Sequence, residues 1–214
     1  MLENIDVLCH SSIKISKGKI IYIDPYKIKD EIHDADIIFC THSHYDHFSE
    51  EDILKIKKED TKLVVTEDCI MKSMSIGFDK ENIIIVEPNC KYNIDGIEFE
   101  TINAYNIEKQ YHPKENLWVG YILNINNIKY YIAGDTDITE ENKKINCDVA
   151  FLPIGGIYTM NFKEAASLAN AINPKIVVPT HYGELVGRLE DAQTFQKLIK
   201  ENIRCEIYIK RTDK

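Results

Sequence analysis

Short runs of β-branched and aromatic residues, each ending in turn residues, dominate the hydrophobic pattern of this chain. Apolar runs of this length between turn residues are typical of buried strands. We predict strands over residues 19–24, 35–40, 62–66, 82–87, 96–102, 117–125, 128–134, 148–153, 175–180 and 205–210. Only Asn126 and Asn127 separate the sixth run from the seventh, and this two-residue connection favours a tight hairpin.

Helical patterns interrupt the strands at three places. We predict helices over residues 50–58, 162–172 and 189–201. Ser49 can cap the first helix, and Asn161 with Glu164 makes a capping-box-like start for the second, which Asn173 and Pro174 end. Strands clustered early and mixed with a few helices predict two sheets covered by helices. The predicted fold class is therefore α/β (α+β), in a single domain over residues 1–214.

Composition and charge narrow the class of protein. The 214 residues are 44% hydrophobic and 29% charged, as in an ordinary soluble globular domain. No apolar run approaches the roughly 20 residues that span a bilayer, and the N-terminus lacks a secretory pattern. Six scattered cysteines without a C-x-x-C pair fit free thiols in a reducing cytoplasm. A net charge of −9 argues against nucleic acid or a membrane surface as a partner. We therefore expect a cytoplasmic protein.

Metal-ligand residue types concentrate in the segment "HSHYDH", residues 42–47. Its four candidate ligands are His42, His44, Asp46 and His47. The segment follows the apolar run "ADIIFC", so it lies on a loop at the carboxyl end of a predicted strand. Asp135 and His181 also directly follow predicted strands. A lone histidine after a strand is usually a surface residue, but four residues of metal-ligating types at this spacing indicate a metal site. Imidazole and carboxylate together suit zinc, iron or manganese.

These motifs resemble those of the metallo-β-lactamase superfamily. "HSHYDH" is similar to the family's H-x-H-x-D-H loop, "GDTD" to its bridging-aspartate motif and "THYG" to its last histidine. "YIDP", "LPIGGIYTM" and "PTHYG" more narrowly resemble the branch that contains ascorbate-6-phosphate lactonase and small metal-dependent hydrolases. The resemblance implies a four-layer αββα sandwich with metals at one edge of its two sheets.

The resemblance also implies a ligand set. His42 and His44 would bind a first metal, Asp46, His47 and His181 a second, and Asp135 would bridge the two. The expected cofactor is a divalent transition metal, one or two per chain, with zinc favoured and manganese or iron as alternatives.

One ligand of the family pattern is missing. The family places a further first-site histidine between the H-x-H-x-D-H loop and the bridging aspartate, and Asn106 stands where this histidine aligns. His112, six residues later, is the alternative ligand. If Asn106 takes the position, its neutral amide predicts a weaker first site. We expect Asn106, His112 and Tyr158 to line the substrate pocket, with His10 at the edge of the site.

The implied activity is metal-dependent hydrolysis, in which a metal-bound hydroxide attacks an ester, lactone or phosphodiester. Asp46 and Asp135 would be catalytic, orienting the water and accepting its proton. One alternative is an iron-dependent redox enzyme of the same fold, although the related diiron oxygen reductases carry glutamate where this chain has His44. The other is a non-catalytic or regulatory metal-binding member of the family.

The short stretch of chain between the motifs favours a small substrate. The short interval between Asp135 and His181 leaves no room for the inserted domain of nucleic-acid-processing relatives. We therefore expect a small-molecule substrate, and the protein is compatible with a homo-oligomer. Four basic side chains near the site favour a phosphorylated metabolite: Lys109, His112, Lys114 and Arg188.

Overall fold

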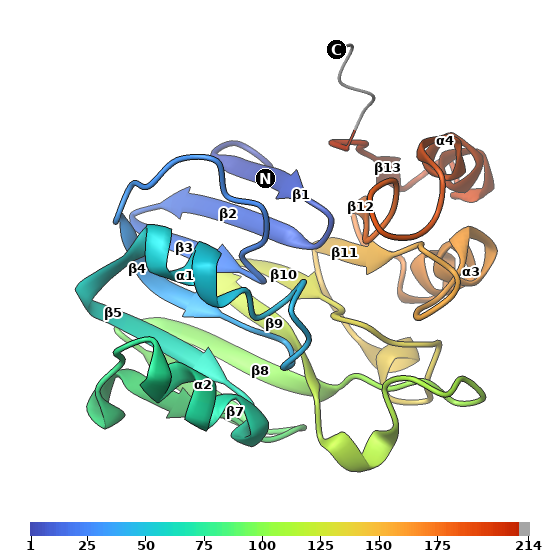
Figure 1. The fold of residues 1–214 in the computed structure, drawn as a ribbon. Helices are drawn as coiled ribbons and strands as arrows, with labels where there is room; N and C mark the ends of the chain where they lie inside the picture. Colours follow the sequence, from blue (N-terminus) through green and yellow to red (C-terminus); the bar gives the residue numbers. More distant parts are fainter. Residues whose placement is uncertain (210–214) are drawn as a thin grey trace. The chain divides into compact units, whose positions relative to one another are not determined.

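The computed structural model describes residues 1–209, and these divide into two compact units. One unit contains residues 2–87, and the other contains residue 1 and the chain from residue 88 onwards. Each unit is built around one β-sheet (Figure 1). Within residues 1–209, no helix is both long enough and apolar enough to cross a membrane.

The sheet of the first unit has six strands in the order β1-β2-β3-β4-β5-β6. Their bounds are β1 Ile5–Cys9, β2 Ser12–Lys17, β3 Lys19–Ile23, β4 Ala35–Phe39, β5 Lys57–Val65 and β6 Ile83–Ile85. The first three strands are antiparallel, whereas β3 to β6 are parallel. Two helices, α1 Glu50–Ile56 and α2 Ile70–Ser75, belong to this unit. Ile53 and Ile56 of α1 pack with Ile38 of β4 in its hydrophobic core.

The sheet of the second unit has seven strands in the order β13-β12-β11-β10-β9-β8-β7. Their bounds are β7 Lys91–Ile94, β8 Ile97–Asn103, β9 Val119–Ile125, β10 Ile128–Ile132, β11 Val149–Pro153, β12 Ile176–Thr180 and β13 Arg204–Cys205. The helices α3 Phe162–Ile172 and α4 Leu189–Leu198 share a core with this sheet. Short 3₁₀ turns cover Glu67–Cys69, Lys80–Asn82, Lys114–Asn116 and Asn142–Lys144.

Two sheets with helices confirm the predicted mixed α/β class, and the local signals explain several boundaries. The Ser49 side chain accepts a hydrogen bond from the backbone of Asp52 at the start of α1. Asn161 forms the complete capping box of α3, and Asn173 ends that helix in the left-handed conformation. Asn126 and Asn127 both have positive φ angles between β9 and β10, as a tight hairpin requires.

Other boundaries were wrong. The helix predicted over residues 50–58 ends at Ile56, because Lys57 already pairs with Ala35 as the first residue of β5. The predicted helix over 189–201 ends at Leu198. Of the predicted strand over 205–210, only Cys205 is in a strand, and Lys210 lies outside the described residues. The strands β1, β2 and β7 and the helix α2 were not predicted.

The parallel strands determine where polar side chains gather. Because β3 and β4 run parallel, their carboxyl ends lie at one edge of the first sheet, and Asp24 and Thr41 follow them there. In the second sheet β10, β11 and β12 are parallel, so Asp135 and His181 leave the same edge. Each unit therefore presents one group of candidate ligands at a strand-end edge.

Candidate metal centre

The first unit carries the H-x-H-x-D-H loop immediately after β4. The backbone N–H groups of His47 and Phe48 both donate to the carbonyl of His44, at 3.0 and 2.7 Å, which folds the loop tightly. His42 and His47 are buried, and Asp46 is 8% exposed. Nε2 of His42 lies 3.0 Å from Nδ1 of His44. This short segment therefore concentrates four side chains of the types that ligate metals.

Asp24 fixes the orientation of His47. The buried Asp24 carboxylate lies 2.7 Å from Nδ1 of His47 and accepts hydrogen bonds from the backbone N–H and the hydroxyl of Thr41, at 2.8 and 2.9 Å. Burial raises the pKa of this carboxyl, while the His47 and Thr41 contacts act in the opposite direction. A carboxylate on Nδ1 leaves Nε2 as the ligand atom of the imidazole, as in many protein metal sites.

His10 joins the same group from the turn between β1 and β2. Its φ angle is +54°, its side chain is buried, and its Nε2 lies 3.3 Å from a carboxylate oxygen of Asp46. One ligand-type atom from each of His10, Asp46 and His47 lies within 4.8 Å of the others. Left-handed backbone at a non-glycine residue costs free energy and concentrates at functional sites.

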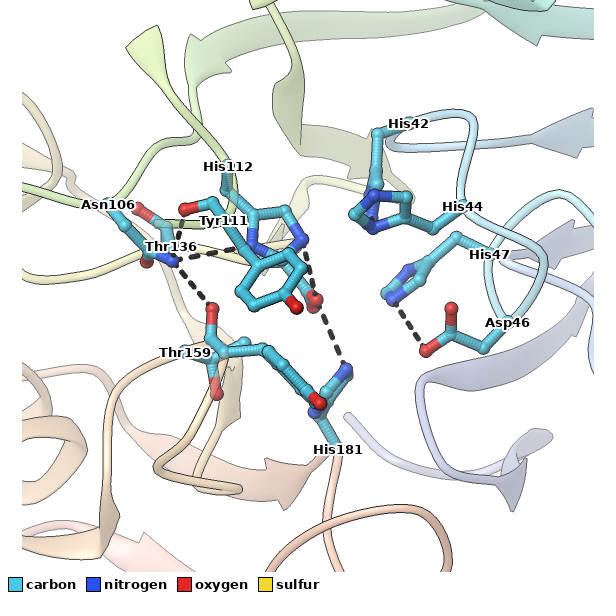
Figure 2. A network of polar contacts seen from close by, with 12 residues as sticks. His42, His44, Asp46, His47, Asn106, Tyr111, His112, Thr136, Thr159 and His181 are labelled. Atoms are coloured by element: carbon cyan, nitrogen blue, oxygen red, sulfur yellow. Dashed lines mark hydrogen bonds and ion pairs between the residues drawn. The ribbon is translucent and has the colours of Figure 1, made fainter. Parts of the chain in front are cut away.

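The second unit carries Asp135, between two imidazole rings. A single Asp135 oxygen, Oδ2, lies 3.2 Å from Nε2 of His112 and 3.1 Å from Nε2 of His181. Figure 2 shows both contacts as dashed lines. Both histidines have positive φ angles, +61° and +56°, and all three side chains are buried. Two imidazole nitrogens and a carboxylate thus converge on one point.

Gly155 makes the position of His181 attainable. A Cβ atom at residue 155 would lie 2.5 Å from the His181 carbonyl oxygen and 2.5 Å from Cγ2 of Val186. Neither distance is tolerated in real proteins, so only glycine fits. Gly155 therefore permits the close approach of its backbone to His181.

Asn106 supports the loop that delivers His112. Its side-chain amide donates to the carbonyls of Tyr111 and Tyr158, at 2.8 and 2.7 Å, and its Nδ2 lies 3.3 Å from Nδ1 of His112 (Figure 2). The backbone N–H of Asn106 also donates to the His112 carbonyl. The ring of Tyr158 also packs edge-on against the ring of Tyr111, with 4.8 Å between the ring centroids. It is thus the NH₂ group of Asn106 that faces the histidine.

Both donor sets fit a transition metal. Each consists of imidazole nitrogens and carboxylate oxygens, the ligand types that zinc, iron and manganese accept in proteins. Each is also held in place by neighbouring groups: Asp24 in the first unit, and Asn106 and Gly155 in the second. Such support is expected of a metal site and is unusual for solvated histidines.

Comparison with known proteins identifies the family. The model of the beta-lactamase superfamily domain matches residues 4–181, which include every candidate ligand and run through both units. This chain belongs to the β-lactamase superfamily. A UPF0173 metal-dependent hydrolase of Ligilactobacillus salivarius is 32% identical, over 91% of this chain and 92% of the relative. One of Thermococcus onnurineus is 30% identical, over 94% of this chain and 93% of the relative.

A solved structure agrees with this superfamily assignment. The crystal structure of a Parabacteroides distasonis protein, named as a metal-dependent hydrolase, matches with a TM-score of 0.80 and 28% identity. The match covers 95% of this chain and 91% of that protein. The predicted resemblance and the metallo-β-lactamase fold are thereby confirmed. The extent of a single domain over residues 1–214 stays a prediction.

The structure brings together most of the candidate ligands that the sequence singled out in this superfamily member, and it adds one supporting group. His42, His44, Asp46 and His47 lie together in the first unit, and Asp135 and His181 lie together in the second. Asp24 was not singled out, although it follows a strand inside the "YIDP" motif. The same signal that drew attention to Asp135, a carboxylate at the end of an apolar strand, would have found it.

Asp24 gives a first prediction for this superfamily member. Asp24→Asn keeps the shape of the side chain but weakens its hold on the Nδ1 proton of His47. We expect a 10- to 100-fold loss of metal affinity or activity, roughly the range for groups that orient metal ligands. Metal titration and steady-state kinetics measure the loss. Asp34→Asn is the matched control, because Asp34 contacts Lys14 and Tyr22 in the same unit. An unchanged affinity in Asp24→Asn would refute the orienting role.

Proposed function

We propose that this metal-dependent hydrolase cleaves an ester, lactone or phosphodiester bond of a small molecule. The observation that carries the proposal is the convergence of His112 and His181 on one oxygen of Asp135, at 3.2 and 3.1 Å. Three buried ligating groups in contact suit a bound cation that offsets the charge of the carboxylate. The family relationship supplies the reaction class, hydrolysis.

The ligand assignment follows the motif order. By this order, Asp46, His47 and His181 would hold one metal, His42 and His44 would hold a second, and Asp135 would be a ligand as well. His112 completes the second position, because its Nε2 contacts Asp135 whereas Asn106 turns its NH₂ group towards the histidine. The proposal thus takes the alternative in which His112 is the missing ligand and Asn106 supports it.

The chain's own residues have distinct parts in the reaction. A divalent transition metal, when bound, lowers the pKa of a coordinated water towards neutrality and polarises the scissile bond. Asp46 and Asp135 would orient the attacking water, and one of these two carboxylates would accept its proton. Asp24 holds His47 in the tautomer that presents Nε2. Zinc is the favoured metal, with manganese or iron as alternatives.

The lysines near the candidate ligands of the second unit support a phosphorylated substrate less strongly than the sequence alone indicates. Lys109 forms an ion pair with Asp137 and also donates to the Thr159 carbonyl at 2.8 Å. Lys114 pairs with Glu141 at 3.0 Å. Both ammonium groups are therefore already matched by carboxylates. A phosphorylated substrate, if it is used, needs positive charge from elsewhere.

The role of Asn106 gives a second prediction. If its amide only supports His112, Asn106→His should not raise bound metal, and Asn106→Ala should weaken one metal position by about tenfold. Isothermal titration calorimetry with Zn²⁺ measures both positions. Asn170→Ala is the matched control, since this amide bridges to Leu198 on α4. A gain of one tightly bound metal in Asn106→His would instead make residue 106 the ligand position.

A substrate panel tests the proposed activity. Protein freed of metal with a chelator is reloaded with Zn²⁺, Mn²⁺ or Fe²⁺ and assayed on aryl esters, lactones and phosphodiesters. We expect turnover on at least one class that requires the metal, without oxygen consumption. Oxygen uptake with Fe²⁺ would favour the redox alternative. Complete inactivity of a fully metal-loaded protein across the panel would favour a non-catalytic role.

A further inference from the structure

A groove in the first unit borders the H-x-H-x-D-H loop. It has a volume of about 610 Å³, and all its lining residues belong to the first unit. Its aromatic and apolar wall consists of Tyr26, Ile28, Tyr45 and Phe48. Its charged rim consists of Lys27, Lys29, Glu50, Glu51, Asp52, Lys55 and Lys72, with Ser49 beside them. The proposed ligand set does not include any residue of the groove wall, although Tyr45 lies inside the H-x-H-x-D-H segment.

The aromatic wall is continuous with the candidate ligands. Tyr45 stands between His44 and Asp46 in the loop, and its ring lies edge-on to Tyr26, 6.1 Å between centroids. The Tyr26 ring in turn lies edge-on to the ring of His10, also at 6.1 Å. Tyr45 is 62% exposed, although the residues around it in the loop are largely buried. An exposed aromatic ring beside the candidate metal ligands can contact a substrate.

The rim carries four lysine ammonium groups against three carboxylates, a net charge of +1. Lys55 is matched by Glu51 and Asp52, at 2.8 and 3.1 Å. Across residues 1–209, neither Lys29 nor Lys72 forms an ion pair with a carboxylate within 4 Å. The Lys72 ammonium group donates to the Ser43 carbonyl at 2.8 Å, inside the ligand loop. It also lies 5.9 Å from the centre of the Phe48 ring. A positive charge therefore stands beside the loop and over the apolar wall.

We propose that this groove binds an anionic aromatic group of the substrate, a planar ring that carries a carboxylate or phosphate. The ring would contact Tyr45 and Tyr26, and Lys72 and Lys29 would attract the negative charge. Aromatic contacts and ammonium groups together favour such a group over an alkyl chain or a neutral sugar. The inference rests on the proposed hydrolase function, because it concerns the part of the substrate that does not react.

Three phosphonates separate the contributions of the groove from those of the metal. Methylphosphonate, phenylphosphonate and 4-phosphonobenzoate all carry the same metal-binding phosphonate group. Their affinities for metal-loaded protein are measured by calorimetry and compared as ratios. We expect phenylphosphonate to bind about fivefold more tightly than methylphosphonate, the range of one aromatic contact. The added carboxylate of 4-phosphonobenzoate should give about a further threefold gain.

Variants assign each gain to its residue. Tyr45→Ala should abolish the phenyl gain and Tyr45→Phe should recover it, whereas Lys72→Met should abolish only the carboxylate gain. Tyr92→Ala and Lys197→Met, in the second unit, are the matched controls and should leave both ratios unchanged. For any aryl substrate that is turned over, Tyr45→Ala should act mainly on KM.

The outcomes distinguish the groove from the proposed function. If methylphosphonate binds only to metal-loaded protein but the phenyl ring adds nothing, the groove inference is overturned and the metal centre stands. The same holds if Tyr45→Ala keeps the phenyl gain. If none of the phosphonates binds the metal-loaded protein, both the proposed metal-centred activity and the groove inference fail.

Discussion

Asp135→Ala is expected to abolish hydrolysis and to lower the amount of bound metal. Asp135 supplies the oxygen on which the Nε2 atoms of two imidazole rings converge. Its replacement therefore removes a proposed metal ligand and the negative charge that would balance the cation. The loss of activity should exceed about a hundredfold, the upper range for groups that only orient ligands. Kinetic assays and elemental analysis of the purified variant measure the two effects. The fold should persist, because Asp135 lies beyond the end of β10.

A second carboxylate at the opposite end of the same sheet provides the control. Asp148 precedes β11, accepts a hydrogen bond from the backbone of Lys129 and pairs with Lys175 at 2.8 Å. Asp148→Ala should retain metal and activity, with any effect confined to thermal stability. Full activity in Asp135→Ala would show that another carboxylate holds the metal, and equal losses in both variants would indicate general destabilisation.

The double variant His44→Ala with His47→Ala is expected to lose most of its bound metal. These residues belong to different positions in the proposed assignment, so the two changes weaken both. Metal content per chain after dialysis, determined by plasma mass spectrometry, is the measurement. His33→Ala is the matched control, because His33 is a half-exposed histidine of the same unit that contacts Glu31. Unchanged metal content in the double variant would refute the ligand assignment.

The sequence predicted correctly those features that depend on a local pattern of residues. A buried strand followed at once by H-x-H-x-D-H placed the loop, and the capping signals of Ser49 and Asn161 placed the helix starts. It missed β1 and β2, although Ile13 and Ile15 alternate with polar residues in β2 and are fully buried. Period-two alternation was the available signal, and it is weak over so few residues.

Other features depend on contacts that no local pattern encodes. Asp24 meets His47 across 23 residues of sequence, because β3 and β4 happen to be parallel neighbours. The roles of Asn106 and His112 depend on a six-residue loop in which His112 takes a positive φ angle. An alignment by position placed Asn106 at the ligand position and left His112 as the alternative, whereas the loop geometry brings His112 to Asp135.

We propose that the H-x-H-x-D-H loop and Asp135 both bind metal. Anomalous X-ray diffraction from crystals of zinc-loaded protein, collected at the zinc absorption edge, tests it most directly. We expect one or two peaks, each about 2.0–2.2 Å from its histidine nitrogens and carboxylate oxygens, with both Asp135 and the H-x-H-x-D-H loop among the ligands. A peak at His112 rather than Asn106 would fit the assignment. Zinc bound without Asp135 or without the H-x-H-x-D-H loop, or bound elsewhere, would refute the ligand assignment.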